Sequence, residues 1–154
     1  MAEAALAVYI VDDDPAVRDS LSLLLSLRGY RTATFASAEA FLEALRPDWA
    51  GCLMADIRMP GMSGLQLQGE LAARRVALPV VIMTAHGDVD SARAAFKAHA
   101  VEFLEKPFDD EGPARAVEAC FARERDRLEA SRVAVAGRES LAALTQRERE
   151  IAVL

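Results

Sequence analysis

Five short segments rich in apolar residues alternate along this sequence with segments of helical periodicity. The first covers residues 6–11 and is apolar at every position. A strand of this kind is covered on both faces, which is typical of a parallel sheet between two layers of helices. Further strands are expected at 30–35, 52–55, 79–84 and 101–104. The alternation predicts a doubly wound α/β fold with right-handed crossovers.

The segments between these strands carry helix start and stop signals. Asp14 precedes Pro15 and is expected to cap a helix that ends at Gly29. Ser37 is expected to cap a second helix, which Pro47 closes. The remaining helices are expected at 64–75, from residue 88 onward, and from residue 112 past residue 132.

Composition and charge exclude several classes of function. The 154 residues allow one domain with a core and a short appendage. No apolar run approaches the ~20 residues that cross a bilayer, and Glu3 replaces the basic start of a signal peptide. A net charge of -6 argues against direct nucleic-acid binding. Cys52 and Cys120 lie in apolar contexts, so we expect reduced core residues of a cytoplasmic protein.

Polar groups stand at the ends of four of the expected strands. Asp12 and Asp13 follow the first strand, Asp56 follows the third, Thr84 ends the fourth, and Lys106 follows the fifth. Asp56 on its own would be interpreted as a turn residue. Because the carboxyl ends of parallel strands meet at one edge of the sheet, we expect these groups to lie together.

The chemistry of this edge favours phosphoryl transfer. Carboxylates ~4 Å apart repel by ~4 kcal/mol at an effective dielectric constant of ~20, so the site needs a cation. An all-oxygen cluster suits Mg²⁺. This ion and Lys106 would favour an ionised carboxylate and would stabilise transferring phosphoryl oxygens, with Thr84 as a further donor. We therefore predict Asp56 as a covalent nucleophile for a phosphoryl group.

The same positions resemble the receiver domain of two-component response regulators. The matching segments are residues 11–15, Asp56 with residues 59–64, residues 84–87, and residues 106–108. The resemblance covers about residues 5–125. It implies a flavodoxin-like fold with a five-stranded parallel sheet of order 2-1-3-4-5, and transfer of a phosphoryl group to Asp56 from a sensor histidine kinase.

The resemblance also implies the ligands of the metal. Mg²⁺ would be held by Asp13, Asp56 and the backbone carbonyl of Arg58, and Asp12 would act through water. By the same resemblance, the bond between Lys106 and the following proline would be cis.

A conformational switch is implied as well. Lys106 and Thr84 would contact the phosphoryl group, and Phe103 matches the aromatic switch position of the family. Movement of Thr84 toward the phosphoryl group would let Phe103 rotate and would change the surface of the fourth helix, fifth strand and fifth helix. We predict that phosphorylation promotes a homodimer through this surface, whose charged residues are Arg93, Lys97, Asp109, Asp110 and Glu111.

The chain continues beyond the expected receiver, which we place at residues 1–125. Residues 126–143 are predicted to form a helical linker, and residues 144–154 resemble the start of a LuxR-type helix-turn-helix domain of the NarL/FixJ group. Thr145 would cap its first helix, with Glu148 completing a capping box. The recognition helix would be missing, so DNA would be bound only through the missing part of that domain.

Two other functions compete with a phosphorylation switch. A phosphohydrolase could use Asp12 as nucleophile and Asp14 as acid. It is disfavoured because Pro15 and Ala16 stand near where that family places a threonine, and because it leaves Asp56 unexplained. A free-standing receiver acting only through protein contacts is the third reading, and the tail argues against it. We predict a switch that assists its own phosphoryl transfer, not an enzyme.

Overall fold

The computed structural model describes residues 6–85, 90, 93–94, 97 and 100–153. These residues belong to two units, one ending at Glu124 and the other comprising residues 125–154. The expected helix cap at Asp88, and the inner face of that helix at Val89, Ala92 and Phe96, lie outside the described residues.

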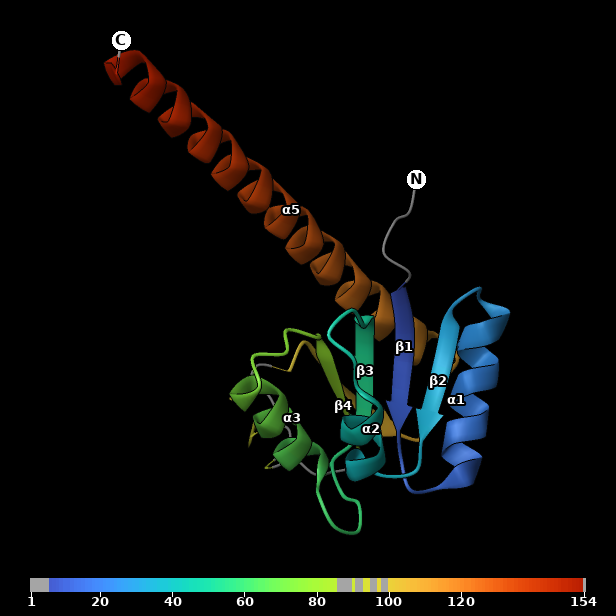
Figure 1. Ribbon diagram of the computed structural model, residues 1–154. Coiled ribbons are helices and arrows are strands. Elements are labelled where there is room, and N and C mark those ends of the chain that lie inside the picture. Colours follow the sequence, from blue (N-terminus) through green and yellow to red (C-terminus); the bar gives the residue numbers. More distant parts are fainter. Residues whose placement is uncertain (1–5, 86–89, 91–92, 95–96, 98–99, 154) are drawn as a thin grey trace. The chain divides into compact units, whose positions relative to one another are not determined.

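The first unit is built on a five-stranded parallel sheet of order β2-β1-β3-β4-β5 (Figure 1). The strands are β1 (Leu6–Val11), β2 (Arg31–Phe35), β3 (Ala50–Asp56), β4 (Val80–Ala85) and β5 (Glu102–Lys106). All seven residues of β3 are buried, as expected for a central strand with helices on both faces. The predicted strand order and fold class are confirmed.

Helices α1 (Pro15–Leu27), α2 (Ala38–Ala44), α3 (Gly64–Ala73) and α5 (Glu111–Val153) follow strands in the chain. The side chain of Asp14 accepts a hydrogen bond from the Ala16 amide and that of Ser37 accepts one from Ala40, so both predicted caps are confirmed. A capping box at the start of α3, formed by Ser63 with Gln66, was not predicted.

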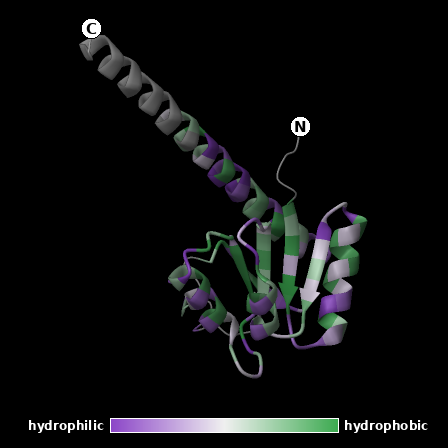
Figure 2. Cartoon of the chain, in the orientation of Figure 1, coloured by the Kyte–Doolittle hydropathy of each residue, from purple (hydrophilic) through white to green (hydrophobic). Residues whose placement is uncertain are grey.

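Successive residues of the central strands contribute to two separate cores. Leu53 packs with α2 and α3, whereas Met54 packs with α1 and the first part of α5. Figure 2 shows β1 and β3 mostly in the hydrophobic colour, whereas the edge strand β2 is paler and the helices carry both hydrophobic and hydrophilic residues. Cys52 and Cys120 are free and buried in the second core, as predicted.

One charged residue is buried in the α5 segment of this unit. Glu124 is fully buried, and its carboxylate accepts a hydrogen bond of 2.8 Å from the amide of Gly51 at the start of β3. The contact ties α5 to the amino end of the central strand. This contact could not be predicted from the sequence, because the partners lie 73 positions apart and one of them is a backbone amide.

In the second unit, α5 continues without a break to Val153. Thr145 lies inside this helix, so the prediction that it caps a new helix is wrong. Residues 126–153 contain one glycine, Gly137, and no proline, and a single glycine costs a helix only ~1 kcal/mol. The division of this segment into linker and output domain stays a prediction. Within the described ranges, no helix is both long and apolar enough to cross a membrane.

Candidate functional site

Three aspartates meet at the carboxyl edge of the sheet. β1 and β3 pair in parallel up to Val11 and Ala55, which places Asp12 and Asp56 side by side at the ends of these strands. Carboxylate oxygens of Asp12, Asp13 and Asp56 all lie within 4.8 Å of one another. Asp12 and Asp56 are buried, whereas Asp13 is exposed. The structure thus brings together the three carboxylates that the sequence predicted.

Lys106 connects two of these carboxylates. Its ammonium Nζ donates to Asp12 Oδ2 and to Asp56 Oδ2, both at 2.8 Å. Burial alone would lower the pKa of Lys106, but hydrogen bonds and attraction to the two carboxylates outweigh it and raise that pKa. Burial is also the largest influence on Asp12, and it raises the pKa of this carboxyl against the hydrogen bond from Lys106. Lys106 is therefore a cation at the site, and its bond to Pro107 is cis, as predicted.

Thr84 is a further predicted site residue, on the strand next to Asp56. It is fully buried, and its hydroxyl has no hydrogen-bond partner within the described structure. A buried hydroxyl without a partner costs about 1–3 kcal/mol, so such a group calls for an explanation. An incoming acceptor at the acidic edge would supply the missing partner.

The turn after β1 separates the role of Asp14 from that of its two neighbours. The Asp14 carboxylate accepts from the Ala16 amide at 2.9 Å and thereby caps α1. Its amide donates to Asp12 Oδ1 at 2.9 Å. Since Asp14 is used as a cap and Asp12 is held by Lys106, a phosphohydrolase with these two residues as acid and nucleophile finds no support in this geometry.

The turn after β3 folds tightly around Asp56. The amide of Arg58 donates to Asp56 Oδ1 at 3.1 Å. A Cβ added at Gly64 would lie 2.4 Å from the Asp56 carbonyl oxygen, so glycine lets α3 start directly against the site. This role of Gly64 was not predicted, although a glycine at a helix start was a possible signal. Phe103 is half-buried against the core on the α2 and α3 side, and its rotation stays a prediction.

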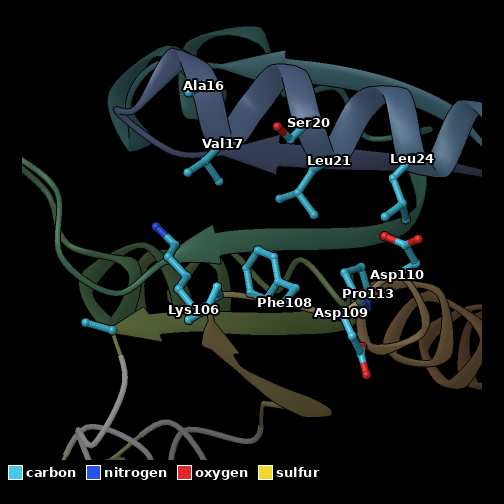
Figure 3. Close-up of a pocket in the computed structure, with 12 residues that line it drawn as sticks. Ala16, Val17, Ser20, Leu21, Leu24, Lys106, Phe108, Asp109, Asp110 and Pro113 are labelled. Carbon is cyan, nitrogen blue, oxygen red and sulfur yellow. The ribbon is translucent and has the colours of Figure 1, made fainter.

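A cavity of about 540 Å³ lies beside the acidic edge, between α1 and the segment that joins β5 to α5 (Figure 3). Val17, Leu21 and Leu24 point into it from α1 toward Phe108. Lys106 belongs to its lining, so the cavity adjoins the carboxylates. Val17 and Leu24 are only partly buried against the core, and both also line this cavity.

The acidic residues at the start of α5 also lie on the α1 side. Asp109 and Asp110 line the cavity, and Glu111 forms an ion pair of 2.9 Å with Arg28 of α1. These three acids are also predicted to lie on the surface that would form a dimer. All three acids are exposed, and their part in a dimer surface stays a prediction.

Residues 8–118, well over half of the chain, match the family described as response regulator receiver domain. The chain belongs to this family, whose members act in signalling and are not conventional enzymes. Receiver domains bind Mg²⁺ at an acidic cluster, and response regulators partner with histidine kinases and dimerise.

Similar proteins and solved structures identify the type of response regulator to which this receiver is related. The transcriptional regulatory protein FixJ of Azorhizobium caulinodans is 47% identical over 149 residues, which cover 96% of this chain and 70% of that protein. The structure of the response regulator StyR is similar with a TM-score of 0.79 and 43% identity, covering 84% of this chain and 66% of StyR. The crystal structure of FixJ-N is similar with a TM-score of 0.71 and 43% identity, covering 78% of this chain and 94% of FixJ-N. The chain is a receiver of the FixJ type, a phosphoacceptor in two-component signalling that regulates transcription.

Proposed function

We propose that Asp56 accepts the phosphoryl group from a sensor histidine kinase, in a reaction that needs Mg²⁺. The arrangement that supports this most directly is the set of groups around Asp56: two further carboxylates, an ammonium at 2.8 Å, and the unpartnered hydroxyl of Thr84. A carboxylate oxygen of Asp56 attacks phosphorus, and the bond from phosphorus to the donor breaks. The test is incubation with acetyl phosphate and Mg²⁺, after which peptide mass spectrometry is expected to place one phosphoryl group on Asp56.

Mg²⁺ would be held by Asp13, Asp56 and the backbone carbonyl of Arg58, with Asp12 acting through water. Among the described residues, the Asp13 carboxylate has no hydrogen-bond or ion-pair partner, so it is available to a metal. The Asp12 carboxylate already accepts from Lys106 and from the Asp14 amide. A bound ion would offset the repulsion between carboxylates and balance the developing charge of the phosphoryl group.

Three single substitutions in the acidic turn are expected to separate these roles. Asp13→Ala should weaken Mg²⁺ binding strongly, because it removes a direct ligand. Asp12→Ala should weaken it less, because the contact runs through water. Asp14→Ala should leave Mg²⁺ affinity unchanged but lower the free energy of unfolding by about 1 kcal/mol, because the cap is lost. Calorimetric titration with Mg²⁺ and thermal unfolding measure the two effects, and equal loss of affinity at Asp13 and Asp14 would contradict the ligand set.

The cavity beside α1 supports docking of a kinase helix at this edge. Its apolar lining would take apolar side chains of a helix, and Asp109 and Asp110 would face basic residues of the same helix. A phosphohistidine carried by that helix could reach Asp56, because Lys106 belongs both to the cavity and to the site.

We further propose that phosphorylation promotes a homodimer through the surface of the fourth helix, β5 and α5, where Arg93 and Lys97 are exposed. The Thr84 hydroxyl would gain a charge-assisted hydrogen bond to the phosphoryl oxygen, and its shift would make room for Phe103. Phosphorylation would then favour the conformation in which the Phe103 ring has rotated. Because this conformation presents the dimer surface, the dimer would be favoured as well. The extended helix after Glu124 would transmit this change to a DNA-binding output domain.

Removing the hydroxyl of Thr84 is expected to uncouple the dimer from phosphorylation. In sedimentation velocity, wild type should shift from monomer to dimer on addition of beryllofluoride and Mg²⁺. Thr84→Ala and Lys106→Ala should both still be labelled to some extent by acetyl phosphate. Both variants should nevertheless stay monomeric. Thr84→Ser keeps the hydroxyl and serves as the matched control that still dimerises. A wild-type dimer of equal strength with and without beryllofluoride would reject the switch.

A further inference from the structure

The side chain of Arg18 contacts the backbone of the acidic turn. Arg18 lies in the first turns of α1 and is half-buried. Its guanidinium Nη1 donates to the backbone carbonyl oxygen of Asp12 at 2.6 Å. This is a charge-assisted hydrogen bond, which is roughly twice as strong as a neutral one. Arg18 is not one of the carboxylates, the ammonium or the hydroxyl that make up the site.

The carbonyl that Arg18 holds belongs to the peptide unit between Asp12 and Asp13. Because a peptide unit is planar, fixing its oxygen also fixes the direction in which the backbone enters Asp13. The Asp13 carboxylate has no partner of its own within the described structure. Its place in the cluster therefore depends on the backbone of the turn.

The other contacts of the turn hold its neighbours on both sides. The Asp12 carboxylate accepts from the Asp14 amide, and the Asp14 carboxylate accepts from the Ala16 amide, both at 2.9 Å. These bonds secure the carboxylate of Asp12 and the start of α1, but neither one acts on the peptide unit that leads into Asp13. Arg18 supplies that restraint.

We propose that Arg18 is a positioning residue that holds Asp13 ready for Mg²⁺. The inference rests on the proposed function, because it takes Asp13 as a direct ligand. The cap at Asp14 and the proline after it start α1 without help from Arg18. Loss of the guanidinium should therefore affect metal affinity far more than folding.

Arg18→Met tests this, because methionine keeps much of the apolar stem and removes every donor. Its matched control is Arg28→Met, a second arginine associated with α1, whose exposed ion pair with Glu111 is remote from the turn. In calorimetry with Mg²⁺ alone, Arg18→Met should bind at least about tenfold more weakly than wild type, as is usual when the support of a metal ligand is lost. Arg28→Met should bind like wild type, and Arg18→Lys should recover most of the affinity.

Two further readouts exclude a purely structural effect. Saturating Mg²⁺ should restore the rate of labelling by acetyl phosphate in Arg18→Met, because the substitution weakens metal binding and leaves the nucleophile intact. In the Asp13→Ala background, Arg18→Met should cause little additional loss of affinity, since the two residues act as one unit.

The outcomes separate this inference from the proposed function. If wild type neither binds Mg²⁺ nor becomes labelled, the proposed function fails. If wild type does both and Arg18→Met binds Mg²⁺ like Arg28→Met, the role of Arg18 is overturned and the function stands. A melting temperature of Arg18→Met far below that of Arg28→Met would also overturn it, because Arg18 would then support the fold.

Discussion

Replacing Asp56 with asparagine is expected to abolish phosphorylation of the protein while leaving it folded. The amide has the shape of the carboxylate but lacks the charge and the nucleophilic oxygen. The substitution removes the ion pair with Lys106 and also the repulsion from Asp12 and Asp13, and these two effects on stability oppose each other. Intact-mass spectrometry after incubation with acetyl phosphate and Mg²⁺ should show one added phosphoryl group on wild type and none on the variant.

Two controls make this result specific. Asp48→Asn changes an exposed carboxylate just before β3 in the same way and should be labelled like wild type. Asp12→Asn tests the alternative of a phosphohydrolase with Asp12 as nucleophile. Such an enzyme would lose labelling in Asp12→Asn and would keep it in Asp56→Asn. Full labelling of Asp56→Asn at the wild-type rate would refute Asp56 as the acceptor.

Gly51→Ala is expected to be among the most destabilising single substitutions in the chain. Gly51 has a φ of +136°, and a Cβ at this position would lie 1.9 Å from the carbonyl oxygen of Ala7 on β1. The strained backbone and the forced separation of two central strands should together cost about 3 kcal/mol or more in the free energy of unfolding. The amide that donates to Glu124 would also be displaced.

The matched control is another glycine. Gly69 lies exposed within α3, and a Cβ there meets no atom within 4 Å. Gly69→Ala should raise the free energy of unfolding by about 0.4–1 kcal/mol, because alanine restricts the unfolded chain and favours the helix. Urea denaturation of the two variants compares them directly. A Gly51→Ala variant as stable as wild type would mean that the close approach to Ala7 is not a constraint in solution.

The acidic site was predictable because its residues stand at strand ends. A buried parallel strand is recognisable from its continuous apolar run, and the carboxyl ends of such strands must meet at one edge. Asp12, Asp13 and Asp56 were therefore placed together without knowledge of any contact, and the structure confirms the cluster. The caps at Asp14 and Ser37 were equally predictable, because a cap depends only on residues within one helical turn.

The end of the chain shows the limit of local signals. A threonine followed three residues later by a glutamate is a typical capping box, yet Thr145 lies inside α5. A helix start also requires that the preceding residues leave the helix, and here they are good helix formers without a proline. The helix propensity of the surrounding residues thus outweighs the local capping motif at Thr145.

The sequence by itself determined the order of the elements and the edge at which the carboxylates gather, and its resemblance to receiver domains implied the strand order of the sheet. Only the tertiary structure decided that Lys106 bridges two carboxylates, that Thr84 lacks a partner, and that Arg18 holds the carbonyl of Asp12. The physical reason is that the two sets of features depend on interactions of different range and between different kinds of groups. Periodicity and capping act over a few neighbouring residues, whereas these contacts join backbone atoms and side chains of elements whose spacing is set by the packing of the whole sheet.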